Sequence, residues 1–261
     1  MSYRWEEMTC PDFAEAVKTT GGVCIVPIGC LEKHGPHLPL GTDAFASLKI
    51  AELAVAQEPA VIFPTMFLGW IHDGKHHPGA VALPPETLMS IYEGIGEECA
   101  RNGLRKVIFL NGHGGNEPFL YYFSWKAMAK ERSYMLYVLR LEDYIYSPEQ
   151  AEIISTGIGH AGEGETSMAL AVRPELVRME KAVPSREAEG RLAHLPPVRT
   201  SFEWYADWSD HYSGDGSLGT AEKGEKLLAG MADKVARVIK AVREDEVTPA
   251  LQAEFFGRVQ H

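Results

Sequence analysis

The sequence is poor in features that define whole classes of protein. The 261-residue chain has only four cysteines and no CxxC pair, and a chain of this length needs no disulfides for stability. Because no run of about 18 apolar residues occurs, we expect no transmembrane helix. The first residues, Met1-Ser-Tyr-Arg-Trp-Glu-Glu, lack the apolar core of a secretory signal peptide. These absences favour a cytoplasmic protein, with Cys24 and Cys30 as buried thiols beside the first strand.

Positive charge is also scarce. The chain has 25 Lys and Arg residues against 36 Asp and Glu residues, and its formal net charge is −11 at pH 7. Nucleic acids and anionic membranes both require a basic patch on their protein partner. The composition therefore argues against either partner, and we expect a small-molecule substrate.

Two common catalytic and nucleotide-binding motifs are missing, and a third lacks its context. The chain contains no Walker A sequence and no GxSxG elbow. Residues Gly214–Gly219 match GxGxxG, but the preceding residues 208–213 do not form an apolar strand pattern. A dinucleotide fingerprint requires that strand, so we reject this interpretation.

Strand and helix patterns alternate along the chain, and 45% of its residues are hydrophobic. Apolar, β-branched runs predict strands, and helical periodicity predicts the helices between them. Such alternation indicates an α/β fold with a mostly parallel sheet covered on both faces. No linker or repeat is visible, so we expect one domain over residues 1–261. The predicted strands are 22–29, 61–64, 106–110 and 135–141, and the predicted helices are 3–20, 43–57, 85–102, 117–132, 168–172 and 220–243, with residues 65–84 and 184–218 irregular.

The most informative stretch is Ile25–Asp43, which begins as a buried strand and then changes character. Glu32, His34, His37 and Asp43 follow within a loop bent by Gly and Pro. Side chains two residues apart in extended backbone point to the same face, so Glu32 and His34 can converge on one ion. The alternative is a polar surface loop with Thr42 or Asp43 capping the next helix.

Two further loops carry residues of the same chemical type. His113 lies in Asn111-Gly-His-Gly-Gly-Asn116, directly after a predicted strand. His160, Glu163 and Glu165 precede the predicted helix 168–172. The alternatives are that His113 is a lone histidine in a turn, and that Glu163 and Glu165 only complement the dipole of the following helix. We expect Glu165 to point into the site and Glu163 to point away, because Met168, Ala169 and Val172 follow Glu165 at helical spacing.

The number of candidate ligands favours two metal ions. Carboxylate and imidazole suit zinc, manganese or iron(II). A single tetrahedral catalytic zinc needs fewer side chains, whereas two ions about 3.5–4 Å apart would use all five, with Asp43 as the bridge. The five predicted ligands are Glu32, His34, Asp43, His113 and Glu165.

These motifs together resemble the signatures of the creatininase (creatinine amidohydrolase) family over residues 22–240. The resembling segments are Glu32-Lys-His-Gly-Pro-His-Leu-Pro-Leu-Gly-Thr-Asp43, Asn111–Asn116, His160–Ser167 and Gly214–Gly224. The resemblance implies a three-layer α/β/α sandwich, a binuclear metal centre and a homo-oligomer, often a hexamer.

The same resemblance assigns roles within the site. It implies that Glu32, Asp43 and His113 hold one metal, that His34 and Asp43 hold the other, and that His160 is the general acid. In creatininase itself a Tyr-Glu pair follows the histidine and supplies a ligand, whereas this chain has Gly114 and Gly115. That departure argues against creatinine as substrate and fits Glu165 as ligand to the second metal.

From these residues we expect a metal-dependent hydrolase of a small cyclic amide or cyclic ketone, with metal-bound hydroxide attacking a carbonyl. The alternatives are a C–C-cleaving hydrolase of a diketo-inositol or keto-sugar, and a formamide deformylase. A non-enzymatic metal-binding protein is disfavoured, because structural zinc sites are usually cysteine-rich. Residues 202–212 and His72, His76 and His77 either shape the pocket or pack as ordinary loops.

Overall fold

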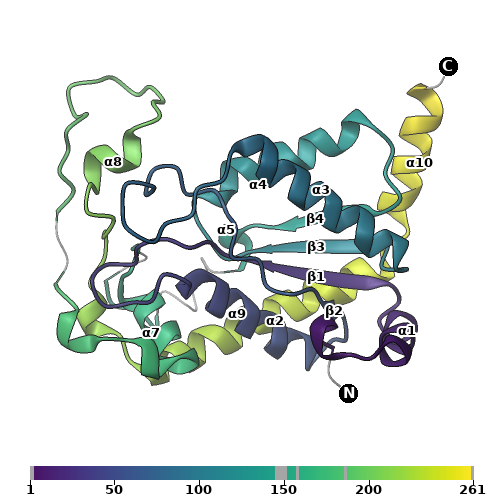
Figure 1. The fold of residues 1–261 in the computed structure, drawn as a ribbon, viewed down its shortest axis with the longest axis horizontal. Helices are drawn as coiled ribbons and strands as arrows, with labels where there is room; N and C mark the ends of the chain where they lie inside the picture. Colours follow the sequence, from purple (N-terminus) through teal and green to yellow (C-terminus); the bar gives the residue numbers. More distant parts are fainter. Residues whose placement is uncertain (1–2, 145–151, 157–158, 185–186, 260–261) are drawn as a thin grey trace.

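Four parallel strands form the central sheet of the computed structural model, which describes residues 3–144, 152–156, 159–184 and 187–259 (Figure 1). The strand order is β2-β1-β3-β4. Their bounds are Val23–Ile28 for β1, Val61–Ile62 for β2, Lys106–Asn111 for β3 and Met135–Leu139 for β4. The predicted parallel sheet is confirmed.

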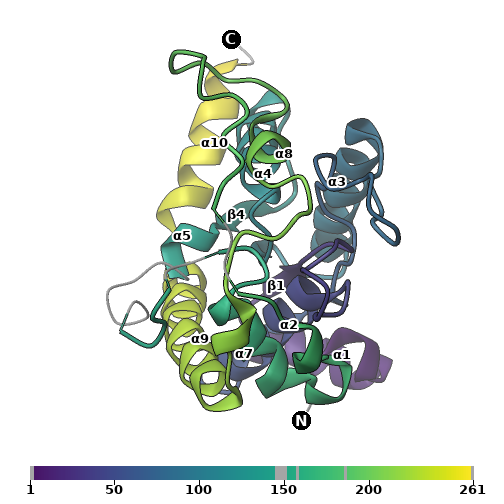
Figure 2. The same ribbon diagram turned by 90° about the vertical axis from the view of Figure 1, so that its left-hand side faces the viewer.

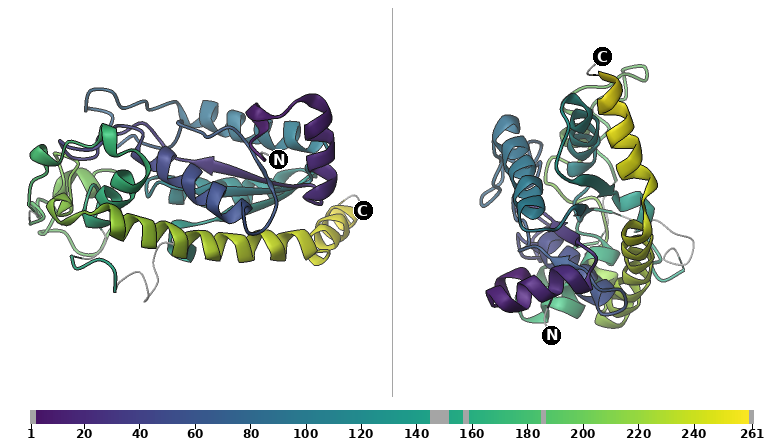
Figure 3. Two further views of the ribbon diagram at one scale, coloured as in Figure 1. Left: turned by 90° about the horizontal axis from the view of Figure 1, so that it is seen from below. Right: turned by 90° about the vertical axis from the view of Figure 1, so that its right-hand side faces the viewer.

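Helices cover both faces of this sheet, so the fold is a three-layer α/β/α sandwich as expected (Figures 1 and 3). On one face lie α2 (Thr42–Val55) and α9 (Ala221–Glu244), whose apolar side chains form one core with the sheet. On the other face lie α1 (Cys10–Thr19), α3 (Pro85–Arg101) and α4 (Asn116–Lys126), which form a second core.

The path of the chain through the sheet determines where a site can form. From β1 the chain moves to β2 at the edge, then returns past β1 to β3. Ile28 at the end of β1 is level with Asn111 at the end of β3, and the Gly112 N–H donates to the Ile28 carbonyl at 2.7 Å. The loops after these two strands therefore start side by side at a topological switch point, where α/β proteins bind ligands.

Several element boundaries differ from the predicted ones. Helix α7 begins at Glu163, five residues before the predicted start, and ends at Val172. Gly164 disfavours a helix on intrinsic propensity, but packing of α7 against α9 overrides this preference. Strand β4 ends at Leu139 because α5 (Leu141–Tyr144) begins directly after it, and helix α10 (Val247–Val259) was not predicted. Part of the predicted lead-in to α7, residues 157–158, lies outside the described residues.

The remaining helices are α5 (Leu141–Tyr144), α8 (Glu203–Asp207), α10 (Val247–Val259) and the 3-10 turns Trp5–Glu7, Ala127–Ala129, Pro174–Leu176, Met179–Lys181 and Gly216–Leu218. In the described part of the chain, no helix combines the length and apolarity needed to cross a membrane.

The block Gly214–Gly224, which includes the rejected dinucleotide motif, leads into α9 and contacts α7 where the two helices pack together (Figure 2). Thr220 caps α9 by accepting from the Lys223 N–H at 3.3 Å, and its own N–H donates to Ser167 Oγ at 3.1 Å. At Gly224 a Cβ would lie 2.0 Å from the Ser167 carbonyl oxygen. The close approach of the two helices therefore requires glycine at this position.

Two glycines of α9 give a matched test of that packing. Gly224→Ala should destabilise the protein by about 1–3 kcal/mol, because the new methyl group has to push α7 away. At Gly230 a Cβ would meet nothing within 4 Å. Gly230→Ala should therefore stabilise the protein by about 0.5–1 kcal/mol through helix propensity. Equilibrium urea denaturation measures both, and equal effects of the two substitutions would contradict the close packing.

Candidate metal centre

Two loops and the first turns of two helices bring the five predicted ligands into one cluster at the carboxyl ends of β1 and β3. The loop after β1 is closed by a hydrogen bond from the Glu32 N–H to the Leu40 carbonyl at 3.1 Å, which returns the chain to α2. Asp43 lies in the first turn of α2, His113 follows β3, and Glu165 lies in the first turn of α7. Glu32, His34, Asp43 and His113 are all buried.

Asp43 lies between the two histidines. Its Oδ1 is 2.9 Å from His34 Nε2, and its Oδ2 is 3.0 Å from His113 Nδ1. The N-terminus of α2 is preceded by Gly41, and no side chain caps it. The alternative interpretation of Asp43 as a helix cap is therefore wrong, because its carboxylate faces the cluster.

Glu32 presents one oxygen to the same cluster. Its Oε1 lies 2.9 Å from His113 Nδ1 and 3.6 Å from His34 Nε2. Within the described residues, this buried oxygen accepts no hydrogen bond of acceptable geometry. A buried carboxylate oxygen without a partner is costly, and a cation beside it would remove that cost.

The outward nitrogens of both histidines are held by backbone carbonyls. His34 Nδ1 lies 3.4 Å from the Glu32 carbonyl, and His113 Nε2 lies 2.9 Å from the Trp70 carbonyl. In the neutral ring that a metal ion binds, an N–H that donates to a carbonyl leaves the other nitrogen unprotonated and directed at the cluster. This arrangement is common around metal-binding histidines, because it fixes both the tautomer and the ring orientation.

The motif Asn111–Asn116 builds the loop that carries His113. Asn111 Oδ1 accepts from the His113 N–H at 3.1 Å, and Asn116 Oδ1 accepts from the Trp70 N–H at 2.7 Å. A Cβ at Gly115 would lie 2.4 Å from His113 Nε2. This loop conformation therefore has no room for a side chain at position 115.

Glu163 and Glu165 have different environments. Glu165 Oε2 lies 3.7 Å from His34 Nε2 in the cluster. Glu163 points away from the cluster, but it is buried rather than exposed. It accepts hydrogen bonds from the backbone and side chains of Ser155 and Thr156 and from Lys223 Nζ at 2.5 Å. Glu163 thus stabilises the start of α7 on the side that faces away from the cluster.

His160 lies over the cluster without a close contact to it. Its Nε2 is 2.7 Å from the Lys33 carbonyl, so Nε2 carries the proton and donates. Its Nδ1 faces inward, 4.0 Å from both Glu32 Oε1 and Glu165 Oε2. Its ring lies 4.4 Å, centroid to centroid, from that of His34.

The charges of the cluster are strongly coupled. Burial raises the pKa of Glu165 to about 7 despite the neighbouring His34. Burial lowers the pKa of His34, but Asp43 outweighs it and raises that pKa to about 10. For His160 burial dominates and lowers the pKa to about 3. The carboxylates of the cluster are thus balanced by protons on imidazole, and bound cations would replace those protons.

Three side chains at the site were not among the residues predicted from the sequence. Cys30, expected only as a buried thiol, donates from Sγ to Asp43 Oδ2 at 3.4 Å. His211 Nε2 lies 2.8 Å from Glu32 Oε2, and Trp204 Nε1 donates to His211 Nδ1 at 3.1 Å. The only signal for these two was their position in the aromatic segment 202–212. His37, by contrast, is buried against Thr166 Oγ1 at 2.8 Å.

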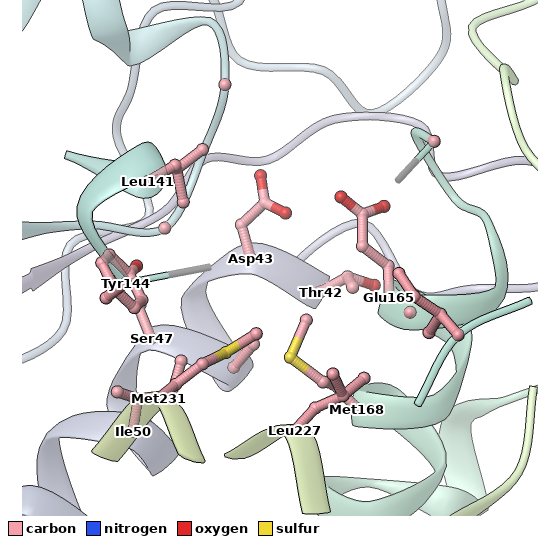
Figure 4. A pocket seen from close by; sticks show the side chains of 16 residues that line it. Thr42, Asp43, Ser47, Ile50, Leu141, Tyr144, Glu165, Met168, Leu227 and Met231 are labelled. Atoms are coloured by element: carbon pink, nitrogen blue, oxygen red, sulfur yellow. The ribbon is translucent and has the colours of Figure 1, made fainter. Parts of the chain in front are cut away.

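Open space adjoins the cluster on both sides. Figure 4 shows Asp43 and Glu165 on one side of an apolar cavity of about 70 Å³, with Met168, Met231 and Leu227 opposite. A polar pocket of about 400 Å³ is lined by Glu32, His113, His160, Glu165, Trp204 and His211. An outer groove of about 760 Å³ shares Asp73, Gly114, Gly115 and Trp204 with this pocket, and His72 and His76 line it.

The donor atoms fit divalent metal ions. Within the described residues, three overlapping groups have ligand atoms that all lie within 4.8 Å of one another. Carboxylate and imidazole are the ligands that zinc and manganese accept, and the orphaned Glu32 Oε1 points among them. The groups are Cys30, Glu32, Asp43 and His113; Glu32, His34 and His160; and His34, Asp43 and Glu165.

Known proteins resemble the chain over most of its length. It is 25% identical to the creatinine amidohydrolase of Pseudomonas putida, over 90% of this chain and 95% of that protein. It is 29% identical to the mycofactocin precursor peptide peptidase of Mycolicibacterium smegmatis, over 85% of each chain. It is 24% identical to the 3-dehydro-scyllo-inosose hydrolase of Thermotoga maritima, over 92% of this chain and 83% of that protein.

Solved structures of creatininase share the fold. A crystal structure of creatinine amidohydrolase superposes with a TM-score of 0.80 at 24% identity, covering 94% of this chain and 99% of the other. A mutant creatininase described as the Zn–Zn type and a manganese creatininase, 24% and 23% identical, each give 0.80 over 94% of this chain and all of theirs. The model of the creatininase family, described as creatinine amidohydrolase, matches residues 6–239. The chain therefore belongs to the creatininase family and is a hydrolase of that family.

Proposed function

We propose that this protein is a binuclear metallohydrolase that cleaves a small cyclic amide or a related carbonyl compound. The observation that carries the proposal is the position of Asp43, whose two oxygens face His34 and His113 separately. Glu32, His113 and Asp43 Oδ2 would hold one divalent ion, and His34, Glu165 and Asp43 Oδ1 would hold the other. Zinc and manganese suit these donors, as in the two creatininase structures named above.

The protein would divide the chemistry between the ions and His160. Two divalent ions, when bound, lower the pKa of water and polarise a carbonyl oxygen. His160 contributes proton transfer: its Nδ1 is free to face the reacting atoms, since Nε2 is held by the Lys33 carbonyl. It would accept the proton of the attacking water at Nδ1 and give it to the leaving nitrogen.

A second candidate is hydrolysis of an amide within a longer chain, such as a peptide. The outer groove that continues from the polar pocket favours it, since its volume of about 760 Å³ exceeds what a small cyclic amide fills. The relationship to the mycofactocin precursor peptide peptidase points the same way. The similarity to 3-dehydro-scyllo-inosose hydrolase keeps C–C cleavage of a keto-inositol open, and a hexameric assembly stays a prediction.

A substrate screen with metal-loaded protein tests the proposal. The panel should contain lactams, formamides, keto-inositols and short peptides, each assayed with zinc and with manganese, and with a chelator as the negative control. Metal-dependent turnover of any of these is expected. Turnover that persists after complete metal removal would contradict a metallohydrolase.

The metal content of three proteins tests the bridge. The wild type should hold about two divalent ions per chain after loading. Asp43→Ala should lose both ions, because each depends on one of its oxygens, whereas His34→Ala should mainly lose one. Elemental analysis after gel filtration measures this. A wild type that never exceeds one ion would rule out the binuclear centre.

The two glutamates of α7 allow a matched test, because Glu165 is a predicted metal ligand and Glu163 has a structural role. Glu165→Gln should lose one ion but change the stability of the metal-free protein little, because a glutamine oxygen can still accept the Ala161 N–H that Glu165 Oε2 accepts at 2.6 Å. Glu163→Gln should keep both ions, but should destabilise the metal-free protein by about 1–3 kcal/mol, because buried hydrogen bonds to a charged group are lost. Metal analysis, together with urea denaturation in the presence of chelator, decides which glutamate is the ligand. Ion loss from Glu163→Gln and lower stability of Glu165→Gln would show that the two roles are reversed.

Substitution of His160 tests proton transfer. His160→Ala should keep both ions and the fold while kcat falls about 10²–10⁴-fold, the usual contribution of a general acid or base. The loss should shrink for a substrate whose leaving group needs no proton. Steady-state kinetics with the best substrate of the screen provides the measurement. Loss of an ion from the variant would instead identify His160 as a ligand.

A further inference from the structure

His211 is held in one tautomer by a tryptophan. The Trp204 indole N–H can only donate, so His211 Nδ1, at 3.1 Å, has to accept. The proton of the neutral ring is then on Nε2, which lies 2.8 Å from Glu32 Oε2 and donates to it. His211 is 2% exposed and Glu32 1%, so water does not compete for this hydrogen bond.

The backbone of His211 has a conformation that side chains rarely adopt. Its φ is +56°, in the left-handed region, and non-glycine residues found there are often held by their surroundings at functional sites. The flanking residues are fixed: the Asp210 carbonyl accepts from Lys33 Nζ, and Ser213 Oγ accepts from the His160 N–H at 2.8 Å. The ring is enclosed as well, since a Cβ at Gly74 would lie 2.9 Å from His211 Cε1.

The hydrogen bond from His211 gives the two oxygens of the Glu32 carboxylate different roles. Oε2 is occupied by His211, and Oε1 is left facing His113 and the metal cluster without a hydrogen bond from the described residues. A carboxylate that is fixed through one oxygen presents the other in a single orientation, which favours metal binding.

We propose that His211 is a positioning residue for Glu32, and that Trp204 acts through His211 by fixing its tautomer. The inference rests on the proposed role of Glu32 as a metal ligand. His211 does not take the part of a ligand itself, because its Nε2 is directed at Glu32 and its Nδ1 at Trp204. The aromatic segment 202–212 would thus set the metal affinity, in addition to lining the pocket.

Metal affinity, measured by chelator competition with zinc, tests this without any substrate. His211→Asn tolerates the left-handed backbone, but its side chain ends before the position of Nε2. It should weaken binding of one ion about 10–100-fold. Trp204→Phe alone should weaken the binding of the same ion. Added to His211→Asn, it should cause no further loss of affinity. Trp208→Phe, at a ring 6.2 Å from that of Trp204 and outside this hydrogen-bond chain, is the control and should bind zinc normally.

The outcomes separate this inference from the proposed function. If Glu32→Gln keeps both ions, the metal centre itself is wrong. If Glu32→Gln loses an ion while His211→Asn binds zinc like the wild type, only the positioning role is wrong. Additive effects of Trp204→Phe and His211→Asn would show that Trp204 acts independently.

Nitrogen-15 NMR of the histidine rings in the zinc-loaded wild type tests the same inference without a substitution. It should find the His211 proton on Nε2, and a proton on Nδ1 would overturn the proposal even if a variant failed to fold. Trp204→Phe should shift part of the population to the other tautomer, because the donor that excludes it is gone.

Discussion

The concentration of carboxylates at a buried point is the constraint on which the rest of the site depends. Glu32 and Asp43 are almost fully buried, and Glu165 lies 3.7 Å from the same histidine that contacts Asp43. Buried carboxylates repel one another and lose their hydration, so each needs a cation or a donor within reach. The histidines of the cluster, and the cations that the proposed function adds, meet that need.

The fold brings the acids and the histidines together through the ends of two adjacent strands. Because β1 and β3 run in parallel and end level, their following loops leave the sheet at one edge. The loop after β1 then returns to α2, which places Asp43 between His34 of one loop and His113 of the other. Glu165 joins them from the first turn of α7, which is packed closely against α9 at Gly224. A packing contact with a residue far along the chain thus helps to position a charged side chain of the site.

A layer of hydrogen bonds surrounds the cluster and fixes its geometry. The carbonyls of Trp70, Glu32 and Lys33 hold the outward nitrogens of His113, His34 and His160. His211 and Trp204 extend this layer to a carboxylate. Rigid support of this kind holds ligands in place before an ion or substrate arrives, so that little ordering is needed on binding.

The sequence by itself determined the α/β class, the parallel sheet and the convergence of Glu32, His34, Asp43, His113 and Glu165, because strand patterns and residues beyond strand ends are local signals. It also distinguished Glu165 from Glu163 by helical spacing. Only the tertiary structure decided that α7 starts at Glu163, that Cys30 contacts Asp43 and that His211 holds Glu32. His211 is 179 residues from Glu32 in sequence, and no local pattern encodes a hydrogen bond across that separation. The start of α7 likewise depends on packing against α9, which overrides the unfavourable helix propensity of Gly164.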